Sequence, residues 1–105
     1  MEILKKIDLV KKANIYFDGN VTSRSYVDSE GNNKSLGIMM PGEYTFGTDA
    51  AEHMEIISGN VEVLLSGLES NWEEIKAGEY FEVPANSSFD IKVNEPTDYC
   101  CTYIK

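Results

Sequence analysis

The chain has 105 residues, of which 42% are hydrophobic and 26% charged, and its 18 acidic and 9 basic residues give a formal net charge of −9. This size and balance are typical of one globular domain and exclude a second independent core. Because so acidic a surface repels phosphate backbones and anionic lipids, we expect neither nucleic acid nor a membrane as a partner.

The chain also lacks the sequence signals of export and membrane insertion. No stretch approaches the roughly 20 apolar residues of a spanning helix, and no apolar run followed by small residues marks a secretory signal. Cys100 and Cys101 are adjacent, so they offer neither a loop-closing disulfide nor the spaced pair of a zinc site. We therefore expect reduced thiols, at least one of them in the core, and a cytoplasmic location.

Residues 1–13 differ in pattern from the rest of the chain. Ile3, Ile7 and Val10 recur near helical spacing, with lysines around them. This pattern favours a short amphipathic helix or an ordered arm. The sequence thus predicts an N-terminal extension, followed by one β domain over residues 14–105.

From residue 14 onward, runs rich in Val, Ile, Tyr, Phe and Thr alternate with clusters of Gly, Asn, Ser, Asp and Pro. Such runs are typical of short antiparallel strands separated by turns. The predicted strands are 15–17, 21–27, 35–40, 43–48, 53–58, 61–65, 72–76, 80–83, 88–93 and 99–104. So many short strands in one small domain predict an all-β sandwich or barrel rather than an open sheet.

Residues 41–59 of this domain resemble the first of the two motifs of the cupin barrels. In that motif a Gly precedes two His one residue apart, then a Glu, and then a second Gly. Gly59 stands seven residues after Glu52, as the second Gly stands after the Glu of the motif. In this register the two His positions are occupied by Phe46 and Thr48.

Residues 78–84, Gly-Glu-Tyr-Phe-Glu-Val-Pro, resemble the second cupin motif, whose third His position falls at Phe89. The two motifs together imply a single-domain cupin β-barrel, that is, a double-stranded β-helix or jelly roll. A lone Glu52 cannot hold a transition metal, which usually takes three or more protein ligands. We therefore expect no metal and no cofactor.

Strand alternation predicts which side chains face the interior of the barrel. Tyr44, Phe46 and Thr48 share one face of their strand, and Glu52 and Phe89 are expected on the inner faces of theirs. The resulting cavity is aromatic, with one carboxylate and a few hydroxyls. A carboxylate there is costly unless it is hydrogen-bonded or used. A site residue and a rim residue in water remain equally open for Glu52, and simple packing remains open for the aromatic rings.

A longer resemblance covers residues 14–104. It rests on Gly42-Glu-Tyr-Thr-Phe46 within the run 35–46, and on the segments 54–59, 61–65, 77–78, 83–84 and 94–97 with Tyr99 and Cys101. These segments resemble the pyrimidine/purine nucleoside phosphorylase family of small cupins. The resemblance implies phosphorolysis: a nucleoside and inorganic phosphate give a free base and ribose 1-phosphate, reversibly and with broad tolerance of the base.

Under this resemblance, we expect catalysis from groups that act on the sugar: Glu52, Tyr44 and Thr48. We expect nucleoside and phosphate to be bound by aromatic rings and by polar side chains: Phe46, Phe89, Ser35, Ser87 and Lys34. For Lys34, a solvated loop residue remains the alternative. His53 directly follows Glu52 and is expected on the opposite face, at the surface.

The main alternative function is a metal-free cupin that binds or senses a small molecule without catalysis. A metal-dependent cupin oxygenase ranks third, because the ligands are absent. Small barrels often pair through an exposed sheet edge or face, so we expect a homodimer to which residues 1–13 contribute.

Overall fold

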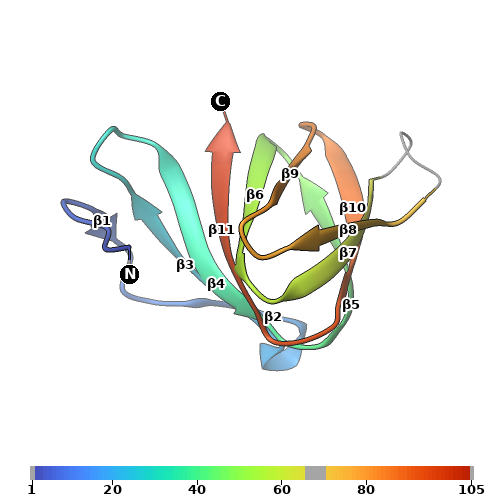
Figure 1. The fold of residues 1–105 in the computed structure, drawn as a ribbon. Coiled ribbons are helices and arrows are strands. Elements are labelled where there is room, and N and C mark those ends of the chain that lie inside the picture. The colour runs from blue at the N-terminus through green and yellow to red at the C-terminus, as the bar shows by residue number, and fades with distance from the viewer. Residues whose placement is uncertain (1, 66–70, 105) are drawn as a thin grey trace.

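The structure, a computed structural model, describes residues 2–65 and 71–104 of the chain (Figure 1). The strands and one 3-10 turn, η1, follow in this order: β1 (Asp8–Leu9), β2 (Asn14–Tyr16), η1 (Phe17–Gly19), β3 (Val21–Val27), β4 (Asn33–Met39), β5 (Gly42–Thr48), β6 (Ala51–Ser58), β7 (Asn60–Leu65), β8 (Glu73–Lys76), β9 (Tyr80–Val83), β10 (Ser87–Val93) and β11 (Thr97–Ile104). Each predicted strand is present, and β1 is additional. No helix in the two described ranges is long and apolar enough to cross a membrane.

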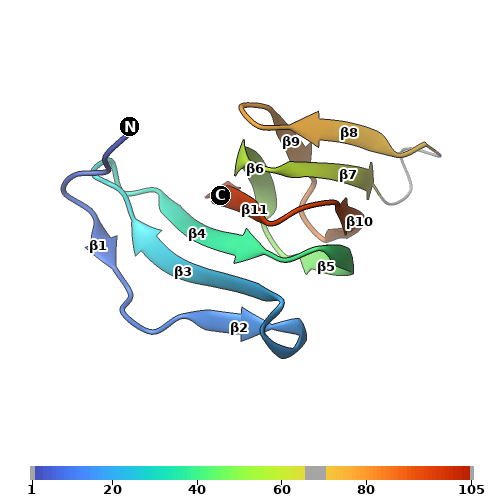
Figure 2. The ribbon, with the colours of Figure 1, turned by 60° about the horizontal axis from the view of Figure 1, so that its bottom comes forward.

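The strands form two antiparallel sheets that face each other. The larger sheet has the order β1-β3-β4-β11-β6-β9, with β2 also paired to β3, and the smaller sheet has the order β5-β10-β7-β8. Among the described residues, no hydrogen-bonded strand pair joins the two sheets. The predicted jelly roll is therefore confirmed, as a sandwich of two sheets rather than a closed barrel. The part of the larger sheet formed by β1 to β4 extends beyond the smaller sheet (Figures 1 and 2).

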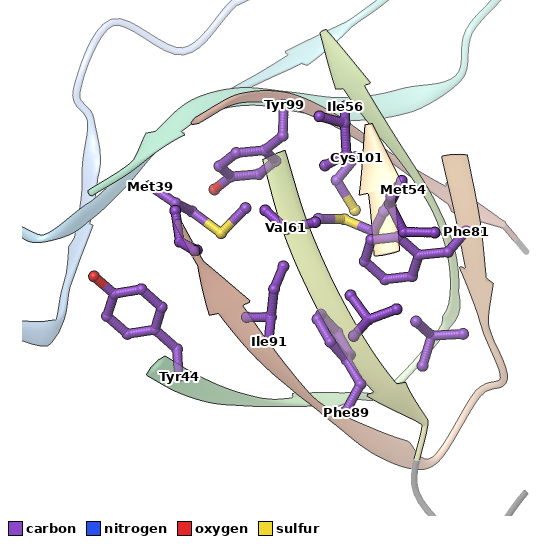
Figure 3. Close-up of a cluster of buried hydrophobic side chains, with 14 of the residues drawn as sticks. Met39, Tyr44, Met54, Ile56, Val61, Phe81, Phe89, Ile91, Tyr99 and Cys101 are labelled. Atoms are coloured by element: carbon purple, nitrogen blue, oxygen red, sulfur yellow. The ribbon is translucent and has the colours of Figure 1, made fainter. Parts of the chain in front are cut away.

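The core forms where the inner faces of the two sheets meet. In β10, Phe89, Ile91 and Val93 are buried while the residues between them are partly exposed, which is the alternation of a half-buried strand. Figure 3 shows Met54 and Cys101 from the larger sheet and Phe89 from the smaller sheet directed into one interior. This shared interior also holds the cavity described below.

Two glycines allow close approaches that shape the sandwich. Gly59 links β6 to β7 with a φ of 105°, and a side chain there would meet Thr97. Gly37 in β4 lies opposite both Ser23 in β3 and Tyr99 in β11. A Cβ at Gly37 would collide with the carbonyl of Thr22 and with the Tyr99 hydroxyl. Both positions therefore require glycine.

Residues 2–13 form an arm along the edge of β3. Asp8 and Leu9 pair with Val27 and Tyr26, and Val10 donates a backbone hydrogen bond to the Ser25 carbonyl at 2.9 Å. Of the two forms predicted for this segment, the described residues adopt an extended arm with a short strand and no amphipathic helix. Pairing with β3 satisfies edge groups that a separate helix would leave unpaired.

Candidate active site

A cavity of about 210 Å³ lies among the inner faces of the strands. Its lining comes from seven strands and consists of Tyr16, Ser23, Ser35, Met39, Phe46, Gly47, Glu52, Met54, Phe89, Tyr99, Cys101 and Tyr103. Most of these residues are apolar or aromatic and a few are polar, as in small-molecule sites. Drug-sized pockets begin at roughly 300 Å³, so a ligand of that size would extend beyond this cavity.

Four polar groups of the cavity come from three neighbouring strands of the larger sheet. The strand register places Ser35 of β4 opposite Cys101 of β11, and Tyr103 of β11 opposite Glu52 of β6. Cys101 and Tyr103 are two residues apart and so project to the same face. The Ser35 and Tyr103 hydroxyl oxygens lie 3.3 Å apart and share a hydrogen bond. One carboxyl, one thiol and two hydroxyls therefore form a compact cluster.

Burial sets the protonation of this cluster. It raises the pKa of Glu52 above its ordinary value of 4.5, and the Cys101 thiol, as a hydrogen-bond donor, opposes part of that shift. Burial first, and the nearby Glu52 charge second, raise the pKa of Cys101. Burial also raises the pKa of Tyr103 to about 12. At neutral pH the thiol and the phenol therefore keep their protons, and both can donate hydrogen bonds into the cavity.

The smaller sheet supplies an aromatic wall. Phe46 of β5 lies opposite Phe89 of β10, and the two rings stack with centroids 5.5 Å apart. Phe89 is 2% exposed, whereas Phe46 is only partly buried against the core. The polar cluster and these rings thus face each other from different sheets.

The residues at the cupin ligand positions do not fit a metal. Phe46, Thr48 and Phe89 stand at the three His positions of the motifs, and none of them offers the nitrogen that a divalent metal would need. Within the described ranges, no group of three or more His, Cys, Asp and Glu side chains is arranged to hold a metal ion.

The structure brings four of the eight predicted site residues to the cavity: Glu52, Ser35, Phe46 and Phe89. It does not bring the other four there. The Thr48 hydroxyl donates to the Pro84 carbonyl at 2.6 Å and accepts from the Ser87 amide at 3.0 Å, so it ties β5 to Pro84 and to the start of β10.

The other two residues outside the cavity also have partners of their own. The Tyr44 hydroxyl donates to the Met40 carbonyl at 2.7 Å. Lys34 precedes the inward-facing Ser35 and points to the opposite face, where its ammonium lies 3.4 Å from Asp28. His53 likewise faces away from Glu52 and lies 3.5 Å from the Glu82 carboxylate, so its predicted orientation is confirmed.

Sequence reasoning missed several residues that line the cavity. Cys101 and Tyr103 could have been found, because Tyr99, Cys101 and Tyr103 alternate along one predicted strand. Tyr16 gives no such signal, since its strand has only three residues and its place in the cavity depends on how β2 pairs with β3.

Comparison with known proteins identifies the family. The family model described as "Pyrimidine/purine nucleoside phosphorylase" matches residues 11–103. The chain belongs to this family. A curated pyrimidine/purine nucleoside phosphorylase from Syntrophotalea carbinolica is 55% identical over 105 residues, which is 100% of both chains. The N-terminal arm is therefore shared with that nucleoside phosphorylase relative, although the family model begins at residue 11.

Solved structures agree with the fold. A protein of unknown function from an Acinetobacter species superposes with a TM-score of 0.92 at 36% identity, over 97% of this chain and 98% of that one. An RmlC-like cupin from Shewanella frigidimarina superposes with a TM-score of 0.69 at 14% identity, over 88% of this chain and 81% of that one. This member of the pyrimidine/purine nucleoside phosphorylase family thus has the cupin fold.

Proposed function

We propose that this protein is a nucleoside phosphorylase of broad specificity, which cleaves the N-glycosidic bond of purine and pyrimidine nucleosides with inorganic phosphate. The observation that carries the proposal is the placement of Glu52. Its carboxyl is partly buried among aromatic rings and lies beside protonated donors, in a chain whose relatives are named for this activity. A carboxyl with a perturbed pKa in a mostly apolar cavity is typical of a functional site.

The reaction gives the Glu52 carboxylate a direct role. As the bond between the sugar C1′ and the base nitrogen breaks, its electron pair leaves with the base and positive charge builds on the sugar. A carboxylate beside the sugar stabilises this oxocarbenium-like transition state. A phosphate oxygen then bonds to C1′, and the proton lost by phosphate ends on the departing base nitrogen, giving free base and ribose 1-phosphate.

The hydrogen-bond donors that the described cavity lining offers to phosphate are uncharged. No Lys or Arg side chain is among the described residues that line the cavity. The Ser35 and Tyr103 hydroxyls, 3.3 Å apart, can donate to one anion from adjacent positions. Hydrogen bonds from neutral groups are weaker than those from charged groups, and the net charge of −9 opposes the anion. We therefore expect phosphate to bind more weakly than the nucleoside.

Broad specificity follows from the aromatic wall. A ring face attracts any base because every base has a π face, whereas reading a base edge requires fixed donors and acceptors. Phe46 offers such a partly exposed face. Uridine and adenosine are accordingly both expected to be substrates.

The outer face of the larger sheet supports a homodimer. It carries a depression of about 300 Å³ whose lining includes Leu36 and Ile38 together with Arg24 and Asp98. Neither Arg24 nor Asp98 forms an ion pair within the described parts of the chain. In a two-fold interface each patch meets its own copy, so Arg24 of each subunit would face Asp98 of the other.

The activity is tested with chelator-treated protein, uridine or adenosine, and phosphate, with free base followed by chromatography. We expect base to be released only with phosphate, in amounts equal to the sugar phosphate formed. In Glu52→Gln, which keeps the shape but removes the charge, turnover should fall about 100-fold. Binding of nucleosides without release of base would instead favour a sensing module.

A further inference from the structure

Tyr16 lies far along the larger sheet from Glu52. It pairs with Val21 of β3, and the strand register continues from Val21 through Met39 to Thr97, at the start of β11. Glu52 is opposite Tyr103, near the end of β11. With about 3.3 Å per residue in a strand, the positions of Thr97 and Tyr103 are about 20 Å apart. Tyr16 and Glu52 therefore line the same cavity from widely separated strand positions of the larger sheet.

The side chain of Tyr16 reaches inward from its strand. It lines the cavity together with Tyr99 and Phe46. Burial and then neighbouring phenols, that of Tyr16 included, raise the pKa of Tyr99. Tyr16 nevertheless remains 46% exposed. An aromatic ring that lines a cavity and keeps nearly half its surface free is available to a ligand.

The other aromatic residues predicted to bind the base have little free surface. Tyr44 is 7% exposed and Phe89 is 2% exposed, and one face of Phe89 is covered by Phe46. Phe46 is partly buried. Tyr103 also lines the cavity and is 38% exposed, but it lies opposite Glu52 and its hydroxyl shares a hydrogen bond with Ser35. Away from Glu52, the rings of the cavity that offer surface to a planar base are therefore Tyr16 and Phe46.

The turn that follows Tyr16 is strained. Phe17 and Asp18 have φ values of 50° and 56°, followed by Gly19 at 94°. Residues other than glycine rarely adopt such angles, and for a bulky one like Phe this is an outlier. The Asn20 amide and side chain hold the turn by donating to the Phe17 carbonyl at 3.1 and 3.0 Å. Backbone strain of this kind concentrates at functional sites.

This turn also connects Tyr16 to the aromatic wall. The Phe17 ring packs against Tyr44 with centroids 5.0 Å apart and against the edge of Phe46 at 5.5 Å. The strained backbone thus directs Phe17 onto the smaller sheet while Tyr16, its neighbour, stays paired to the larger one. This one turn therefore follows Tyr16 directly and contacts Phe46 through the ring of Phe17.

We propose that Tyr16 is the base-stacking residue of the site: the purine or pyrimidine ring lies against Tyr16 and Phe46, and the sugar lies toward Glu52. This inference rests on the proposed function. It assigns a specificity role to the ring of Tyr16 and none to its hydroxyl.

The test compares steady-state kinetics of the full chain with Tyr16→Leu, Tyr16→Phe and the matched control Ile15→Ala. Ile15 is on the same strand, is 67% exposed and does not line the cavity. For Tyr16→Leu we expect KM for uridine and adenosine to rise about tenfold, with kcat and KM for phosphate within about twofold. Tyr16→Phe and Ile15→Ala should match the unaltered chain.

Three results would overturn the assignment: unchanged KM in Tyr16→Leu, an equal rise in Tyr16→Phe, or a loss confined to kcat. Failure of the proposed function is a separate outcome, seen as no phosphate-dependent release by the unaltered chain. In that case, calorimetric titration with adenosine still tests stacking. Binding that weakens about tenfold in Tyr16→Leu but not in Tyr16→Phe supports it, and equal binding by all three chains contradicts it.

Discussion

Burial makes the charged form of Glu52 costly whether or not a substrate is present. The cause is desolvation, which raises the pKa of this carboxyl above 4.5 despite the Cys101 thiol beside it. Because the folded-state pKa is raised, the stability contributed by the protonated form is complete below pH 4.5 and is lost as the pH rises through the folded-state value. Raising the pH above 4.5 therefore costs the folded chain stability at this residue.

Glu52→Gln is expected to be more stable than the unaltered chain at pH 8, and the difference should disappear below the ordinary pKa of a glutamate, about 4.5. Thermal unfolding followed by circular dichroism over a pH series measures this. Asp90→Asn serves as the control, since Asp90 lies on the exposed side of β10 and accepts a hydrogen bond from Thr45. Identical melting of Glu52→Gln and the unaltered chain at pH 8 would contradict the cost assigned to the buried charge.

At the scale of single residues, the sequence predicted which way side chains face better than which groups they contact. The motif register and strand alternation correctly placed Glu52, Phe46 and Phe89 toward the interior. Alternation alone also argues against Lys34 and Ser35 serving one site, because neighbouring strand residues face opposite ways. The commitment of the Thr48 hydroxyl to Pro84 and Ser87 is a tertiary contact, which strand pattern does not predict.

At the scale of elements, the larger sheet leaves no room for a side chain at Gly37. Its neighbours across the sheet are Ser23 and Tyr99, and the Tyr99 hydroxyl donates to the Thr22 carbonyl at 3.2 Å. A side chain at Gly37 would occupy the space of this hydrogen bond. The joining of β3, β4 and β11, and hence the floor of the cavity, depends on this glycine.

Gly37→Ala is expected to reduce the free energy of unfolding by about 3 kcal/mol, because the added carbon overlaps backbone that cannot move independently. Gly47→Ala is the matched control: its Cβ would meet only the Ser87 carbonyl, at 3.8 Å. Urea unfolding of both variants gives the comparison. Similar midpoints for the two would show that the sheet relaxes around the extra carbon.

The strands of this fold were predictable because nearly all of them alternate, with one face in the core and one outside. The pairing of the arm with β3 was not, since Asp8 and Leu9 are both exposed and their pairing is decided by the free edge of β3. The spacing of Ile3, Ile7 and Val10 is only a weak helical signal, and pairing with β3 overrides it. The η1 turn escaped prediction because Phe17 and Asp18 are poor residues for its backbone angles.

At the scale of the whole molecule, the dimer proposed for the outer face makes a reciprocal charge prediction. Arg24→Asp and Asp98→Arg should each shift the protein toward monomer, since each places like charges across the two-fold axis. The double variant restores opposite charges and should restore the dimer. Analytical ultracentrifugation at low salt gives the masses. Dimer retained in both single variants would exclude this face, and monomer in the unaltered chain would exclude the dimer.

The division of the cavity between two sheets has a consequence for how the shape of the cavity can change. Glu52, Ser35 and Tyr103 belong to the larger sheet, whereas Phe46 and Phe89 belong to the smaller one. Within the described chain, no strand ladder joins these two walls; side-chain packing and single hydrogen bonds such as that from Thr48 to Pro84 connect their sheets. A change in core volume, such as at Ile91 or Val61, can therefore slide one wall past the other by a fraction of an ångström. Substitutions in the core can thus change the shape of the cavity without lining it.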